Sequence, residues 1–133
     1  MSGPAIPTSV VEALTSEVVE DIDAARLWLA SEDVRELILS SLVRIAAVHA
    51  VRCDRRASEA KLRFVQLALA RGADPNRLSE FNYRASAGQS HEINLLTQIS
   101  LIAGPPSFID LLIRWGANFD HRASIITKTL ENG

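Results

Sequence analysis

The sequence predicts an all-α fold, a stack of three antiparallel helix pairs with long connecting loops. The main observation is a phrase that occurs twice, as FVQLALARGADPN at residues 64–76 and as FIDLLIRWGANFD at residues 108–120. The copies are 44 residues apart, and a period in this range indicates stacked units whose faces bury one another. Apolar residues make up 47% of the chain but aromatic residues only 5%, so the predicted core is aliphatic and favours helix-on-helix packing.

Apolar residues at helical spacing predict six helices, each followed by a breaker or a charged segment. Asp21 or Asp23 is the expected N-cap of the second helix, Ser31 that of the third and Ser107 that of the sixth. The expected ranges are 9–19, 22–31, 34–51, 59–71, 93–103 and 107–115.

Gly72 and Gly116 are expected to end the fourth and sixth helices, because glycine tolerates the left-handed conformation at this position. Residues 52–58 form a charged break, and residues 77–92 lack a sustained apolar period and are expected to be the longest loop. The apolar stripes predict that five large side chains are largely buried: Trp28, Leu67, Ile99, Leu111 and Leu112. Leu37 and Trp115 also lie on these stripes at helical spacing.

The repeated phrase resembles the ankyrin repeat family. The match lies in LALARGADPN (67–76) and LLIRWGANFD (111–120), and Gly104 stands twelve residues before Gly116, as in that family. The family's TPLH opening is absent, and a third, weaker copy at residues 20–33 has Glu32 where glycine is expected. The resemblance implies helix–turn–helix units of about 33 residues linked by outward-pointing hairpin loops, here lengthened by insertions.

The resemblance also defines the expected organisation of the chain. Residues 1–8 are expected to be a flexible N-terminus and residues 9–120 an ankyrin-like helical repeat domain. Residues 121–133 are either a C-terminal cap or the start of an incomplete repeat.

Charge is distributed unevenly along the chain. Residues 1–36 hold eight acids and two bases, whereas residues 37–133 hold eight acids and twelve bases. The bases at Arg52, Arg55, Arg56, Lys61 and Arg63 either solvate exposed helix faces or form a patch for a partner with an acidic surface, since arginine pairs bidentately with carboxylates. Nucleic acid is a poor candidate partner because the pI of the chain is about 5.9.

The sequence shows no constellation for chemistry. Its three histidines lie in three different elements, and its single cysteine, Cys53, has no residue nearby in sequence that could act as a general base. We therefore expect no catalytic residues, no metal site and no cofactor. A lone cysteine fits a reducing compartment, and no apolar run reaches the length that spans a membrane. We therefore expect a cytoplasmic protein, or one delivered into a host cell without a secretory signal peptide.

Two functions from different classes remain open at this point. The first is a non-catalytic protein-binding module, such as a small inhibitor, immunity protein or effector that occludes a partner's surface. Its expected contacts are Phe81, Tyr83 and Arg84 in the long loop, with Arg52, Arg55 and Arg56 as a second region, although the two aromatic rings could instead fold back over the repeat. The alternative is a structural or assembly protein that forms homo-oligomers through an exposed end of the stack.

Overall fold

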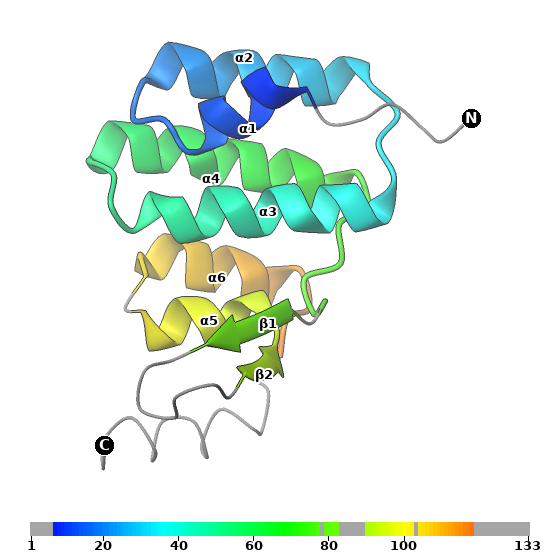
Figure 1. Ribbon diagram of the computed structural model, residues 1–133, viewed down its shortest axis with the longest axis vertical. Helices are drawn as coiled ribbons and strands as arrows, with labels where there is room; N and C mark the ends of the chain where they lie inside the picture. Colours follow the sequence, from blue (N-terminus) through cyan, green and yellow to red (C-terminus); the bar gives the residue numbers. More distant parts are fainter. Residues whose placement is uncertain (1–6, 78, 83–89, 103, 119–133) are drawn as a thin grey trace.

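A computed structural model shows three pairs of helices arranged as successive layers (Figure 1). It describes residues 7–77, 79–82, 90–102 and 104–118; within the two strands it describes the backbone only. The expected flexible start and the C-terminal segment 121–133 therefore lie largely or wholly outside the described residues. The elements are α1 (Thr8–Leu14), α2 (Val19–Ser31), α3 (Glu36–Ala50), α4 (Arg55–Ala70), β1 (Ser79–Asn82), β2 (Ser90–Ile93), α5 (Leu95–Leu101) and α6 (Pro106–Arg114).

Each helix packs against its partner in the pair and against the equivalent helix of the next layer. The first helices α1, α3 and α5 contact one another in that order, and so do the second helices α2, α4 and α6. The middle pair, α3 with α4, therefore has a neighbour on both sides (Figure 1). The predicted helical fold with three helix pairs is confirmed.

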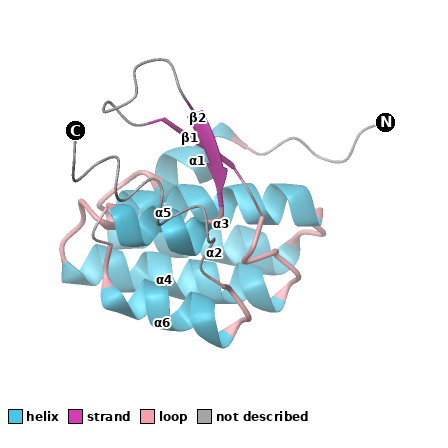
Figure 2. Cartoon of the chain, turned by 90° about the horizontal axis from the view of Figure 1, so that it is seen from below, coloured by secondary structure: helices cyan, strands magenta, loops and turns pink. Residues whose placement is uncertain are grey.

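The segment expected to be the longest loop contains a short β-hairpin instead. β1 and β2 pair antiparallel, with Ser79 opposite Ile93 and Asn82 opposite Ser90. The hairpin stands on the side of the first helices, away from α4 and α6 (Figure 2). The prediction failed here because strands of four residues are too short to show a clear alternation of apolar and polar residues.

The three predicted helix N-caps are wrong. α2 begins at Val19, so Asp21 lies within its first turn, where an acidic side chain complements the helix dipole. Ser31 is the last residue of α2, and its hydroxyl donates to the carbonyl of Trp28 at 3.0 Å. α6 begins at Pro106, because proline has no N–H to satisfy and its φ already suits the first turn.

Side-chain caps occur at two other positions. Asp54 accepts a hydrogen bond from the N–H of Ala57 at 2.9 Å, and Asn94 accepts one from the N–H of Thr97 at 3.0 Å. The cap at Asp54 starts α4 four residues earlier than predicted. Arg55 and Arg56 are consequently the first two residues of a helix and not part of a break.

The two glycines end their helices in the same way, as predicted. Gly72 has φ +113° and Gly116 has φ +93°. After Gly72 the N–H of Ala73 reaches back to the carbonyl of Ala68 at 3.0 Å, and after Gly116 the N–H of Ala117 reaches that of Leu112 at 2.9 Å. This six-to-one bond is the Schellman motif, and the alanine that follows each glycine is buried.

The end of α2 has no such glycine and uses a different device. Arg71, at the end of α4, donates from its Nη1 to the carbonyls of Leu29 and Ala30 at 2.9 and 3.1 Å. Its Nη2 donates to the carbonyl of Glu32. A side chain of the second layer thus satisfies the carbonyls at the C-terminal end of α2 in the first layer, which would otherwise depend on water.

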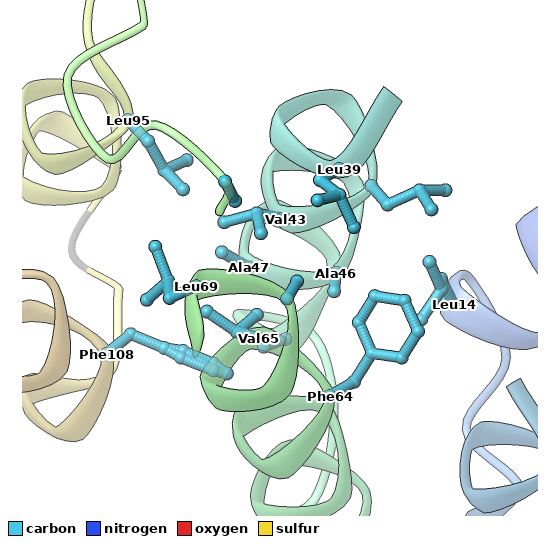
Figure 3. Close-up of a cluster of buried hydrophobic side chains, with 14 of the residues drawn as sticks. Leu14, Leu39, Val43, Ala46, Ala47, Phe64, Val65, Leu69, Leu95 and Phe108 are labelled. Carbon is cyan, nitrogen blue, oxygen red and sulfur yellow. The ribbon is translucent and has the colours of Figure 1, made fainter. Parts of the chain in front are cut away.

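The repeated phenylalanines have equivalent roles in the core. Phe64 of α4 points toward Leu14 in the first layer, and Phe108 of α6 points toward Val65 and Leu69 of the middle layer (Figure 3). On the side of the first helices, Leu95 of α5 faces Val43 of α3. Each repeat therefore inserts its aromatic ring into the layer that precedes it.

The predicted core is correct in part. Ile99 and Leu112 are buried, but Trp28, Leu67 and Leu111 are only partly buried. Leu37 and Trp115, which lie on the apolar stripes of the sequence, are exposed by 55% and 43%. A helical stripe gives the direction of a side chain but not how far the neighbouring layer extends, and both residues lie in the first or last turn beyond that cover.

Replacing Gly72 or Gly116 with valine should lower the free energy of unfolding by about 1–2 kcal/mol, because a β-branched residue resists positive φ. An added Cβ would meet no atom within 4 Å at either site, so the loss would come from the backbone and not from a clash. Urea denaturation followed by circular dichroism would measure it. Gly72→Asn is the matched control and should lose less, since asparagine tolerates this conformation; equal stability of Gly72→Val and the parent would contradict the assignment.

Leu112→Ala should destabilise the protein by about 2–5 kcal/mol, the range for a fully buried leucine, because it leaves a cavity between α6 and its neighbours. Leu67→Ala is a matched comparison from the equivalent helix and should cost clearly less, since Leu67 is only partly buried. Denaturation midpoints would test the order, and a larger loss for Leu67→Ala would contradict it.

Candidate functional site

The described part of the predicted site is the group of three arginines after α3. Arg52 lies in the α3–α4 loop, and Arg55 and Arg56 occupy the first turn of α4; all three are exposed. Of the other candidates, Phe81 lies in β1 opposite His91, where only the backbone is described, and Tyr83 and Arg84 lie outside the described residues. We call Arg52, Arg55 and Arg56 the arginine surface.

The arginine surface is smaller than the five-residue patch considered from the sequence. Lys61 has no exposed surface and its Nζ lies 3.1 Å from the Sγ of Cys53, so its proposed place in a surface patch is wrong. Arg63 is directed to the first layer, with its Nη2 3.6 Å from a carboxylate oxygen of Asp23. The helical period turns both side chains away from the arginine surface.

The position of Arg55 and Arg56 does not serve helix stability. The N-terminal end of a helix carries partial positive charge and favours acidic residues in its first turn. Here Asp54 supplies the cap, but the next two residues are cations. Arg55 is 92% exposed and its Nε pairs with Glu59 at 3.1 Å, a surface pair that stabilises little. The cluster therefore leaves positive charge on the surface of the protein.

A second feature is a groove along α3, which sequence reasoning missed. The groove has a volume of about 320 Å³, and its apolar lining includes Leu37, Ile45 and Leu95. Arg44 and Arg77 lie at its polar side. The signal that could have found it is the run of apolar residues around α3, which is too wide for one buried stripe and leaves Leu37 in solvent.

Arg44 joins the groove to the base of the β-hairpin. Its Nη2 donates to the carbonyl of Arg77 at 2.9 Å, and its Nη1 donates to the side chain of Gln98. Burial lowers the pKa of Arg44 to about 10, so the guanidinium remains charged at neutral pH. Arg77 in turn pairs with Glu36 at 3.3 Å. The chain is thus fixed two residues before β1 begins.

The other end of the hairpin is held by three asparagines. Asn94 follows β2 directly, is buried, and donates from its Nδ2 to the side chain of Asn76 and to the carbonyl of Asn118. Asn76 donates to the carbonyl of Gly116 at 2.9 Å and accepts from the N–H of Asn118 at 2.9 Å. These bonds join the turn after α4 to the turn after α6, and they fix where the hairpin leaves the stack.

A third surface feature is a concavity between α1 and α2 in the first layer. Its volume is about 490 Å³; Ala24, Ala25 and Trp28 contribute apolar surface, and Glu12 and Asp21 contribute acidic groups. Its charge is opposite to that of the arginine surface, since the first 36 residues carry most of the acidic excess.

The described residues show no grouping of three or more histidine, cysteine or carboxylate side chains that could hold a metal ion. In the same part of the chain, no helix is long and apolar enough to cross a membrane. The pKa of His49 is lowered, first by burial and then by the positive charges of Lys61 and Arg52. His49 contacts Cys53 through its main-chain carbonyl, to which the thiol donates at 3.4 Å.

Comparison of the chain with protein-family models, with curated proteins and with solved structures found no match. The assignment of function therefore depends on the geometry described above.

Asn94→Ala should lower the free energy of unfolding by about 1–3 kcal/mol, because it removes the cap of α5 and leaves the buried N–H of Thr97 without its acceptor. It should also speed amide hydrogen exchange in β2. Asn118→Ala is the matched control, since the bonds of Asn118 in this network use its main chain. Urea denaturation and hydrogen exchange would measure both effects, and equal losses in the two variants would contradict the role given to Asn94.

Proposed function

We propose that this protein is a non-catalytic binding module, an ankyrin-like helical repeat stack that covers part of the surface of a partner protein. It would act as a small inhibitor, immunity protein or effector, in the cytoplasm or in a host cell. The observation that carries the proposal is the arginine surface, where exposed cations occupy a helix end that disfavours them. The natural counterpart is an acidic surface on a partner protein.

The arrangement of the layers supports the ankyrin-like part of the proposal. The first helices form one side of the stack, the second helices form the other, and a hairpin stands beside the first helices (Figure 2). The two helix ends with positive-φ glycine are separated by 44 residues and are built from the same hydrogen bonds. Repeat stacks of this kind commonly use such a side, with its inserted loops, for binding.

The groove along α3 supports a contact region beside the hairpin. It joins exposed apolar surface at Leu37 to two arginines held by fixed partners, so little side-chain freedom would be lost when a partner binds. Phe81 in β1 leaves the stack from a base fixed by Arg44 and Asn94, and with Tyr83 and Arg84 it remains our proposed aromatic contact.

A second candidate function, self-assembly, is favoured by one observation. The first layer has no helix pair beyond it among the described residues, and Leu27 of its helix α2 is 67% exposed. A second copy of the chain could cover this end. Light scattering over a range of concentrations distinguishes self-assembly from a binding module, since a binding module should keep the mass of a monomer.

The proposed contacts can be tested against a partner isolated by affinity purification from cells of the source. Phe81→Ala with Tyr83→Ala should weaken binding by about tenfold or more, mainly through faster dissociation, and leave the helical circular dichroism unchanged. Arg55→Glu with Arg56→Glu should mainly slow association, and the effect should shrink at high salt, because exposed charges are screened.

Arg114→Glu is the control for the arginine pair. It reverses an exposed arginine in the last turn of α6, outside the arginine surface, and should leave association unchanged. If neither double variant altered binding to the isolated partner, the proposed contact regions would be wrong.

A further inference from the structure

Lys61 is an unusual member of the core. It has no exposed surface, although lysine is rarely buried unless it is paired. It lies in α4, and its partner Cys53 packs against a small apolar cluster of Ile22, Ala57 and Ala60. Its Nζ is 3.1 Å from the Sγ of Cys53, and this sulfur is the partner that the structure describes for it. A lysine side chain in such a place needs a polar partner, and the sulfur of Cys53 supplies one.

Cys53 is partly exposed, whereas its partner Lys61 is fully buried. Cys53 lies in the α3–α4 loop, and its thiol contacts the carbonyl of His49 at 3.4 Å and the Nζ of Lys61 at 3.1 Å. The pair joins a loop to the interior of the following helix.

We propose that Cys53 and Lys61 form a peroxide-reactive pair that closes into an intramolecular sulfenamide. Hydrogen peroxide is the oxidant. In the first step the sulfur attacks one peroxide oxygen, the O–O bond breaks, and the departing oxygen takes the proton of the thiol and leaves as water. Cys53 is oxidised by two electrons to a sulfenic acid.

The second step forms the cross-link. Nζ attacks the oxidised sulfur, an N–S bond forms, the S–O bond breaks, and the oxygen leaves as water with a proton from the nitrogen. Together the two steps consume one peroxide, release two waters and remove two hydrogens from the protein. A thiol reductant reverses the change by attacking the sulfur and restoring the free amine.

The geometry favours this closure over other fates of the sulfenic acid. The amine is already in contact with the sulfur and its side chain is fully buried, which gives the reaction a high effective concentration. A second peroxide or a free thiol would have to reach the sulfur from solvent.

Mass spectrometry of the folded, full-length chain after treatment with hydrogen peroxide would test the proposal. The intact mass should fall by about 2 Da and return after reduction. After trypsin digestion, residues 53–55 should be joined to residues 57–63, and cleavage after Lys61 should be lost. In urea, where the two groups are not held together, the yield should fall about tenfold or more.

Variants separate this reaction from its alternatives. Lys61→Met should abolish the loss of mass and leave a sulfenic acid that reacts with dimedone, whereas Lys128→Met, which changes the other lysine of the chain, should behave like the parent. Cys53→Ser should not react. The proposal is overturned if peroxide yields only higher oxides of Cys53 or a disulfide-linked dimer. It is also overturned if Lys61→Met keeps the loss of mass, since a backbone nitrogen would then be the acceptor. The linked peptides of the parent chain decide the matter even if Lys61→Met does not fold.

Discussion

The left-handed turns at Gly72 and Gly116 are the constraint on which the stack depends. Each allows an alanine N–H to reach back to a helix carbonyl and buries that alanine, so that the chain leaves the second helix in a fixed direction. This direction places Asn76 where it bonds to the main chain on both sides of the second turn, at Gly116 and Asn118. Hydrogen bonds of Asn76 thus connect the two copies of the turn directly. These bonds fix the distance between the second and third layers at this end of the stack.

The middle layer transmits these constraints through the molecule. Phe64 fills space toward the first layer, and Phe108 does the same toward the middle layer, so the order of packing follows the order of the sequence (Figure 3). Polar contacts follow the same order. Arg71, which follows α4, donates to carbonyls at the C-terminal end of α2, and Arg44 of α3 donates to the carbonyl of Arg77 before the hairpin. Loss of the middle layer would therefore remove both the apolar and the polar support of its neighbours.

The two proposed contact regions lie at opposite ends of α3. The arginine surface follows its C-terminal end, whereas the groove and the base of the hairpin lie toward its N-terminal half and the turn after α4. The Cys53–Lys61 pair lies directly beneath the arginine surface, because Cys53 is the residue between Arg52 and the cap Asp54.

The sequence alone predicted six helices in three pairs and the two glycine turns, because helical period and glycine conformation are local properties. It placed the end of the first helix at residue 19, whereas α1 ends at Leu14 and Val19 begins α2. It did not determine the N-caps at Asp54 and Asn94 or the short hairpin, where several nearby residues compete and four-residue strands carry little pattern. Of the candidate site, it identified Arg52, Arg55 and Arg56. Only the tertiary structure showed that Lys61 is buried against Cys53, that Leu37 is exposed, and that Arg44 and Asn94 fix the hairpin. Burial and pairing between residues distant in sequence depend on how far a neighbouring layer extends, and no local pattern in the sequence records that distance.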